Sequence, residues 1–345
     1  MEYRTLGRTG LSVSAIGLGT EHLIEAGSTI RDVIHQAVEA GLNYIDVLAT
    51  GNSVFWQDFA PAIRPTREKL ILAMSWNYTY LNDMDRSVRD FEESLAIVGN
   101  DYADVAMIRC VDTEENWHGW GQKSLEHLVR LKAQGRVGFI GVSGHFPLVA
   151  RKAIESGLID VLMYQISLAN HDNADVDGLC AACLENNVGL VAMKPYHGGA
   201  LLNYEGRTTS ITPVQCLAHT LSRPVATTVP GVKNVEELQS ALMYLQACEA
   251  EKDWKAAIPL MHQELAGYCV RCNHCLPCPA DIDIGQVILF VGFADWNMND
   301  NLRAWYHAQP ATASACVECN ICVERCPFDV DVIAKMHRAV EIFGI

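Results

Sequence analysis

The stretches CVRCNHCLPCP at residues 269–279 and CVECNICVERCP at residues 316–327 determine how the rest of this chain is interpreted. In both stretches a cysteine recurs every third residue, and each ends on a Cys-Pro pair. Steps of three residues let several thiolates surround one inorganic cluster, and the proline then turns the chain away. The second stretch has the C-x2-C-x2-C-x3-C-P spacing that binds 4Fe–4S clusters, and the first is one residue shorter before its last cysteine.

Two cysteine runs of this bacterial ferredoxin type usually exchange their fourth ligands. We therefore assign one 4Fe–4S cluster to Cys269, Cys272, Cys275 and Cys326. The other 4Fe–4S cluster is assigned to Cys316, Cys319, Cys322 and Cys278. A zinc site would need four ligands in two pairs rather than two evenly spaced runs. A disulfide framework would need a small secreted chain, so the spacing favours iron–sulfur clusters.

The composition is that of a globular protein with room for one large and one small domain. Hydrophobic residues make up 50% of the 345 residues and charged residues 19%. We expect no membrane span, because no long apolar run occurs, and we expect a reducing cytoplasm, because free thiols and clusters need one. The net charge of −15 argues against nucleic acids and anionic membranes as partners.

The N-terminal part of the chain alternates short β-like runs with helical periods. Residues 3–13 predict a hairpin in which Tyr3 and Leu6 pair with Leu11 and Val13 around a turn at 7–10. Eight strands are predicted after it, at 15–18, 44–46, 70–74, 105–108, 137–142, 161–165, 189–193 and 225–229. Glycines at helix C-cap positions are predicted at Gly41, Gly99 and Gly135.

Eight strand–helix units are typical of a closed (β/α)8 TIM barrel. A doubly wound open sheet would usually need a G-x-G-x-x-G motif after its first strand, which residues 17–20 do not supply. The predicted fold class is therefore α/β, a barrel with an N-terminal β-hairpin and a C-terminal α-helical two-cluster domain. We predict domains at residues 1–250 and 251–345, with a helical connection at 251–268.

Several segments of the first 231 residues resemble the aldo-keto reductase family. The similar segments are YRTLGRTGL at 3–11, IGLGT at 16–20, AGLNYID at 40–46, GFIGVS at 138–143, MKP at 193–195 and VPG at 229–231. The two cysteine runs resemble the branch of that family with a C-terminal ferredoxin-like domain. The resemblance implies NAD(P)H-dependent carbonyl reduction at the C-terminal mouth of the barrel, carried out by an Asp, a Tyr, a Lys and a His.

The chain departs from this tetrad at three of its four positions. The resemblance places the Asp at Asp46, but the Tyr falls on Gly51, the Lys on Ser75 and the His on Arg109. Gly51 and Ser75 cannot deliver a proton at neutral pH, so conventional carbonyl reduction by that route is predicted to be absent or very slow. Arg109 is predicted either to clamp an anionic substrate or to form a salt bridge with Asp46 or Asp112.

Other residues at the predicted strand ends suggest further roles at the mouth. His145 is the best candidate for a general acid or base, unless it is simply a solvated loop histidine. The aromatic residues Trp56, Trp76, Trp117, Trp120 and His118 either wall a pocket or pack under the loops. By resemblance, the nicotinamide-binding positions are Gly19, Thr20, Ser143, Gln165 and Lys194.

The resemblance supports nicotinamide binding only in part, since one position departs from the nicotinamide site and another from the site of the NADP 2′-phosphate. Met193 stands where a tyrosine commonly stacks on the nicotinamide ring, and Glu237 stands where an arginine would meet the adenosine 2′-phosphate. NAD is therefore expected to fit at least as well as NADP, and a pocket without either is also plausible.

Four functions remain open at this point. The first is an oxidoreductase in which two clusters pass single electrons to or from a small, anionic substrate at the mouth, with a low-potential partner such as ferredoxin and with NAD(P)H optional. The second is a nicotinamide-dependent reductase whose acid is rebuilt around His145 and Arg109. The third is a non-redox lyase or isomerase with structural clusters. The fourth is an electron-transfer or assembly protein with an inactive barrel.

Overall fold

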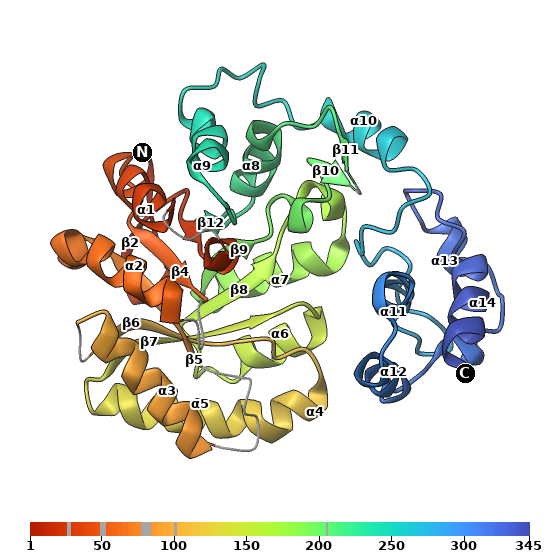
Figure 1. Ribbon diagram of the computed structural model, residues 1–345, viewed down its shortest axis with the longest axis horizontal. Coiled ribbons are helices and arrows are strands. Elements are labelled where there is room, and N and C mark those ends of the chain that lie inside the picture. Colours follow the sequence, from red (N-terminus) through yellow and green to blue (C-terminus); the bar gives the residue numbers. More distant parts are fainter. Residues whose placement is uncertain (26–28, 49–52, 77–83, 100–101, 205) are drawn as a thin grey trace. The chain divides into compact units, whose positions relative to one another are not determined.

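The computed structural model describes all residues except 26–28, 49–52, 77–83, 100–101 and 205 (Figure 1). The chain forms two compact units. The first comprises Met1–Leu168, Ala174–Gly199 and Thr212–Trp254. The second comprises Ala169–Asn173, Ala200–Ile211 and Lys255–Ile345, and therefore holds both cysteine runs.

The first unit is built on an eight-stranded sheet in which all paired strands are parallel. In sheet order the strands are β3 (Leu18–Gly19), β4 (Tyr44–Val47), β5 (Ile71–Trp76), β6 (Ala103–Ile108), β7 (Val137–Gly144), β8 (Val161–Gln165), β9 (Gly189–Met193) and β12 (Thr227–Val229). Parallel bridges from Ile16 to Thr228 and from Gly19 to Gly231 join the last strand to the first. The sheet thus closes on itself, which confirms the predicted (β/α)8 barrel.

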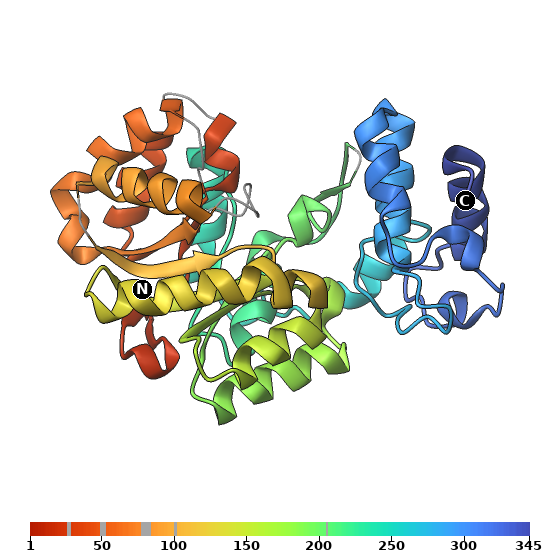
Figure 2. The ribbon, with the colours of Figure 1, turned by 90° about the horizontal axis from the view of Figure 1, so that it is seen from below.

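A helix follows each strand and lies outside the sheet (Figures 1 and 2). The helices are α1 (Thr29–Glu39), α2 (Ser53–Ile63), α3 (Met84–Ile97), α5 (Gln122–Ala133), α6 (Pro147–Glu155), α7 (Ala174–Glu185), α8 (Pro213–Ser222) and α9 (Val235–Leu242), with the short α4 (Glu114–Asn116) before α5. Gly41, Gly99 and Gly135 have φ of +90°, +75° and +73° and stand just beyond α1, α3 and α5, as predicted.

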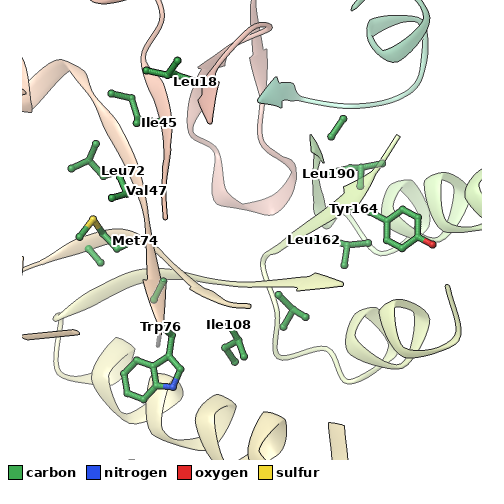
Figure 3. Close-up of a cluster of buried hydrophobic side chains, with 14 of the residues drawn as sticks. Leu18, Ile45, Val47, Leu72, Met74, Trp76, Ile108, Leu162, Tyr164 and Leu190 are labelled. Carbon is green, nitrogen blue, oxygen red and sulfur yellow. The ribbon is translucent and has the colours of Figure 1, made fainter. Parts of the chain in front are cut away.

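The two-residue alternation of each strand separates an outer apolar layer from the barrel interior. Ile45, Leu72 and Leu190 belong to the outer layer, which packs against the helices (Figure 3). Trp76 lies in the same layer, where its ring contacts Phe91 at 5.3 Å between centroids. Of the two alternatives predicted for Trp76, it therefore packs in the core rather than walling a pocket, because its side chain points to the outer face of β5 while its neighbour on the strand points inward. Trp56 and Trp117 are likewise buried in the core.

The N-terminal hairpin packs against the beginning of β9. Its strands β1 (Tyr3–Thr5) and β2 (Ser12–Ser14) are antiparallel, with Tyr3 opposite Ser14 rather than Val13 as predicted. The hydrogen bond from Leu6 N to Leu11 O, 2.9 Å, closes the turn and sets this register. Once Leu6 is opposite Leu11, each earlier residue of β1 must pair with the next later residue of β2. A Cβ on Gly189 would lie 2.7 Å from Leu6 Cδ1, so the glycine allows this close approach. The hairpin thus occupies the N-terminal end of the strands and leaves the opposite end for a site.

The second unit is mainly helical. It contains α10 (Ala257–Glu264), α11 (Ile284–Asn297), α12 (Asp300–His307), α13 (Ile321–Glu324) and α14 (Val332–Phe343), with a short hairpin of β10 (Asn203–Tyr204) and β11 (Arg207–Thr208). Its apolar core includes Phe290, Tyr306 and Phe343, and the last two rings stack 3.9 Å apart. Within the described part of the chain, no helix has the length and apolar character that crossing a membrane requires.

Candidate functional site

A buried ion pair lies at the C-terminal ends of β4 to β6. Arg109, which directly follows β6, donates from Nη2 to Asp46 Oδ1 at 2.6 Å and from Nε to Ser75 Oγ at 3.0 Å. The Arg109 side chain is 4% exposed. Burial raises the pKa of Asp46, and the guanidinium opposes part of that rise. Of the two roles predicted for Arg109, the structure contains the salt bridge to Asp46, which holds the guanidinium beneath the mouth.

A second polar group links the loops after β6, β7 and β9. His145 Nδ1 lies 3.1 Å from Asp112 Oδ2, and His145 Nε2 lies 2.9 Å from Lys194 Nζ. A lysine ammonium only donates, so Nε2 accepts and Nδ1 carries the proton that is donated to Asp112. The side chains of His145 and Asp112 are 25% and 24% exposed, so they are open to small molecules. We call this group the Asp112–His145–Lys194 relay.

The relay is held in place by its backbone. His145 N donates to Asp112 Oδ1 at 2.7 Å, and the Tyr164 hydroxyl donates to the His145 carbonyl at 3.0 Å. Asp112 was considered from the sequence only as a partner of Arg109, so its pairing with His145 was missed. The available signal was its place three residues beyond Arg109, in the loop that follows the predicted fourth strand.

Two residues at the strand ends have left-handed backbone conformations. Cys110 has φ +54° and Lys194 has φ +56°, and neither is glycine. Such conformations cost on the order of 1–2 kcal/mol each and cluster at functional sites. Burial is the main cause that raises the pKa of the Cys110 thiol to about 11, so this thiol stays protonated at neutral pH.

Three of the predicted nicotinamide-binding residues are engaged in holding the strand ends together. The fully buried Thr20 donates from Oγ1 to Asp46 O at 3.0 Å and accepts from Leu48 N at 2.9 Å. Gly19 N donates to the carbonyl of Pro230, and Ser143 Oγ accepts from the amide of Cys110. The other two predicted positions, Gln165 and Lys194, are half-buried at the ends of β8 and β9. Gly51 lies outside the described residues.

The N-terminus of α9 carries negative charge at the predicted dinucleotide phosphate position. Asn234 caps the helix by accepting from Glu237 N at 2.9 Å. The Glu237 carboxylate accepts from Lys233 N at 2.8 Å. Because a helix N-terminus attracts anions through its free amides and its dipole, a carboxylate already bonded there competes with a phosphate.

The cysteines of the second unit line two cavities. One, with an empty volume of about 340 Å³ that includes its opening to solvent, is lined by Cys269, Cys272, Cys275 and Cys326 together with Ile284, Ile288 and Phe328. The other, of about 370 Å³, is lined by Cys275, Cys278, Cys316, Cys319 and Cys322 together with Ile282 and Met336. Each cavity therefore brings together the four cysteines that spacing assigns to one cluster, three from one run and one from the other.

The cysteines of the two cavities do not meet at a single point. Among the described residues, no group of three or more Cys, His, Asp or Glu side chains could hold one metal ion. A tetrahedral zinc needs all four sulfurs within about 2.3 Å of one point, whereas here the thiols border a space. Burial, with repulsion from Cys269 and Cys326 added, raises the pKa of Cys272 to about 12. Thiolates in such a place need positive charge from the group they hold.

The two cysteine runs form a structural repeat. Equivalent residues in the two runs share a left-handed backbone, with φ of +56° and +52° at Arg271 and Glu318, +67° and +60° at Asn273 and Asn320, and +55° and +50° at Asp281 and Asp329. Asp283 caps α11 and Asp331 caps α14, each accepting from the amide three residues later at 3.0 Å. The repeat therefore extends beyond the cysteines into the helices that follow them.

The loop after β8 belongs to the second unit and borders the first cysteine run. His274 Nε2 donates to Asp172 Oδ1 at 2.7 Å, and Asn173 Nδ2 donates to the carbonyl of Cys272 at 3.3 Å.

Comparison with known proteins identifies the barrel. The model of the aldo/keto reductase family matches residues 15–216. Two similar proteins are the uncharacterized oxidoreductase YqkF of Bacillus subtilis, 25% identical over 178 residues, and L-galactose dehydrogenase of Arabidopsis thaliana, 25% identical over 219 residues. These matches cover 49% and 58% of this chain and 57% and 67% of the relatives. Among solved structures, the holo form of aldo-keto reductase AKR11C1 from Bacillus halodurans has a TM-score of 0.59 and 19% identity, covering 74% of this chain and 95% of that one.

Proposed function

Since the chain belongs to the aldo/keto reductase family, we propose that it is an oxidoreductase of that family that uses two 4Fe–4S clusters and a small organic substrate. The observation that carries this proposal is the pair of cavities, one lined by four cysteines and the other by five, with both runs contributing to each. The repeated backbone conformation around the cysteines supports the ferredoxin-like, two-cluster nature of the second unit. Such a second unit agrees with the resemblance of the runs to the ferredoxin-bearing branch of the family.

Single-electron chemistry fits the residues of the barrel mouth better than hydride transfer does. When bound, 4Fe–4S clusters accept and release single electrons. Hydride transfer needs a nicotinamide, yet Thr20 and Ser143 are engaged with backbone groups and Glu237 occupies the N-terminus of α9. The electron donor or acceptor is then a low-potential partner such as ferredoxin, and NAD(P)H is optional.

The relay supplies what a substrate needs besides electrons. The Lys194 ammonium binds a small anionic group, because Arg109 is already paired with Asp46. His145 gives or takes a proton as the charge on the substrate changes, and Asp112 keeps the imidazole oriented.

Metal analysis of protein purified without air tests the cluster assignment. We expect roughly eight iron and eight sulfide per chain, falling to about half in Cys326→Ala. Cys248→Ala is the matched control, because this exposed cysteine lies outside both runs. Zinc, or no metal, in air-free protein would contradict the assignment.

Turnover is tested separately. Chemically reduced protein is mixed with candidate substrates under argon, and reoxidation is followed by the visible absorbance of the clusters. If no candidate substrate reoxidises the reduced clusters faster in the wild-type protein than in the His145→Ala variant, the proposed role of the mouth is wrong.

A nicotinamide-dependent reductase is the second candidate, because the Asp112–His145 pair is a suitable rebuilt acid. Tight NAD(P)H binding, with turnover that needs no reduced cluster, would select it over the first.

A further inference from the structure

We propose that Lys194 is a nucleophilic amine that forms an imine with a carbonyl substrate, with His145 as its base and Asp112 as a positioning residue. This deepens the proposed function by naming the substrate class, and it rests on that function only in placing the substrate at the barrel mouth. Imine formation needs no cluster and no nicotinamide.

The three groups stand in the order that activated nucleophiles require. A nucleophile must hydrogen-bond to a base, and the base must be oriented by a third group. Here Lys194 Nζ is 2.9 Å from His145 Nε2, and His145 Nδ1 is 3.1 Å from Asp112 Oδ2. Each residue comes from a different loop at the C-terminal ends of the strands, where barrel enzymes bind their substrates.

The relay offers a way to remove the ammonium proton. The 2.9 Å hydrogen bond between Lys194 Nζ and His145 Nε2 gives the ammonium proton a direct path to the imidazole. When the proton moves to Nε2, the imidazolium is stabilised by the Asp112 carboxylate and Lys194 becomes a free amine.

The surroundings also select Lys194 as the nucleophile. Its backbone is held at φ +56°, a conformation found at functional sites, and its side chain is half-buried at the end of β9. Cys110 is the other nucleophile nearby, and its thiol stays protonated because it is buried. Among the described residues of the mouth, Lys194 is therefore the amine that an aldehyde or ketone meets beside a base.

The reaction balances without a redox partner. The neutral amine of Lys194 attacks the carbonyl carbon, the C–N bond forms and the C–O π bond breaks. The imidazolium of His145 returns its proton to the oxygen, a second proton moves from the nitrogen to the resulting hydroxyl, and water leaves as the C=N bond forms. The carbonyl compound and the amine are consumed, and one imine and one water are produced.

Reductive trapping on the full-length protein tests this assignment. Protein is incubated under argon with sodium cyanoborohydride and either pyruvate or glyceraldehyde, then digested and mapped by mass spectrometry. We expect a secondary amine at Lys194, with a mass gain equal to the carbonyl compound less one oxygen. The adduct should be absent in Lys194→Arg and retained in Lys233→Arg, a matched change on the exposed loop after β12.

The base and its positioning residue are tested by rate and pH. His145→Asn should slow trapping by roughly a hundredfold. Asp112→Asn should slow it less and shift its pH profile, a change that a purely structural role would not produce. Adducts spread over exposed lysines in wild type, or no adduct at Lys194 with either carbonyl compound, would overturn the proposal. Either result leaves the iron content unchanged, so it is distinguishable from failure of the iron–sulfur proposal.

Discussion

Replacing Arg109 by methionine should destabilise the barrel by about 3–5 kcal/mol at neutral pH, because it leaves the buried Asp46 carboxylate without its cation. Methionine fills most of the same volume, so the loss comes mainly from charge rather than from a cavity. The bonds that disappear are those to Asp46 Oδ1 at 2.6 Å and to Ser75 Oγ at 3.0 Å. Each charge-assisted bond contributes about 1.5–3 kcal/mol, which agrees with the total.

The deficit of Arg109→Met should shrink as the pH falls. Burial already raises the pKa of Asp46, and the variant loses the guanidinium that opposes this rise. A carboxyl group with a raised folded-state pKa favours folding below its unfolded-state pKa, and this contribution is lost as the pH rises through the folded-state value. The variant should therefore approach wild type at acid pH and differ most from it at neutral pH and above.

The measurement is urea unfolding under argon, followed by tryptophan fluorescence at acid and neutral pH. Asp46→Asn/Arg109→Met should recover part of the loss, because no charge remains buried. Arg136→Met is the control, since its exposed pair with Glu92 should contribute at most about 1 kcal/mol. An Arg109→Met protein that unfolds like wild type but no longer turns over would refute this reasoning and make Arg109 a substrate clamp.

Three further changes probe the hairpin, the cysteine repeat and the helix α9 terminus. Gly189→Ala should destabilise the protein by about 1–3 kcal/mol and speed amide exchange in the hairpin, because the new Cβ meets the Leu6 side chain at 2.7 Å. Gly292→Ala is the control and should not destabilise the protein, because open space surrounds that position. Equal melting temperatures for the two variants would contradict the close packing of Leu6 on Gly189. Asp331→Ala should remove about 1 kcal/mol by uncapping α14, and an unchanged thermal unfolding curve would show that this cap is dispensable. Glu237→Gln should tighten sulfate binding at α9 by roughly two- to fivefold in calorimetry, and no change would mean that this carboxylate does not guard the terminus.

The barrel was predictable because its signals are local. A short β-rich run such as 105–108, followed by a helical period and the glycine cap at Gly135, can be recognised without knowing its neighbours. The hairpin register was not predictable from the apolar pattern alone. That pattern allowed Tyr3 to face Val13, whereas the turn placed it opposite Ser14. The sequence left two alternatives open for Trp76, because the direction of a side chain at a strand end depends on which face of the sheet its neighbours take.

The sequence indicated which residues lie at the site, but it did not indicate which of them contact each other. The sequence allowed either Asp46 or Asp112 as the salt-bridge partner of Arg109. Closure of the barrel brought Asp46 and Ser75 within hydrogen-bonding distance of its guanidinium. The link between Asp112 and His145 joins loops 33 residues apart, so no spacing rule could indicate it.

By itself, the sequence determined the strand–helix rhythm, the loss of the usual proton donors and the division of eight cysteines into two sets of four. These depend on spacing along the chain. Only the tertiary structure decided that the guanidinium of Arg109 forms an ion pair with Asp46 and that Lys194, His145 and Asp112 are linked by hydrogen bonds. Their separation in space is set when the parallel strands close into a ring, and hydrogen bonds extend over about 3 Å, a distance that a linear pattern does not encode.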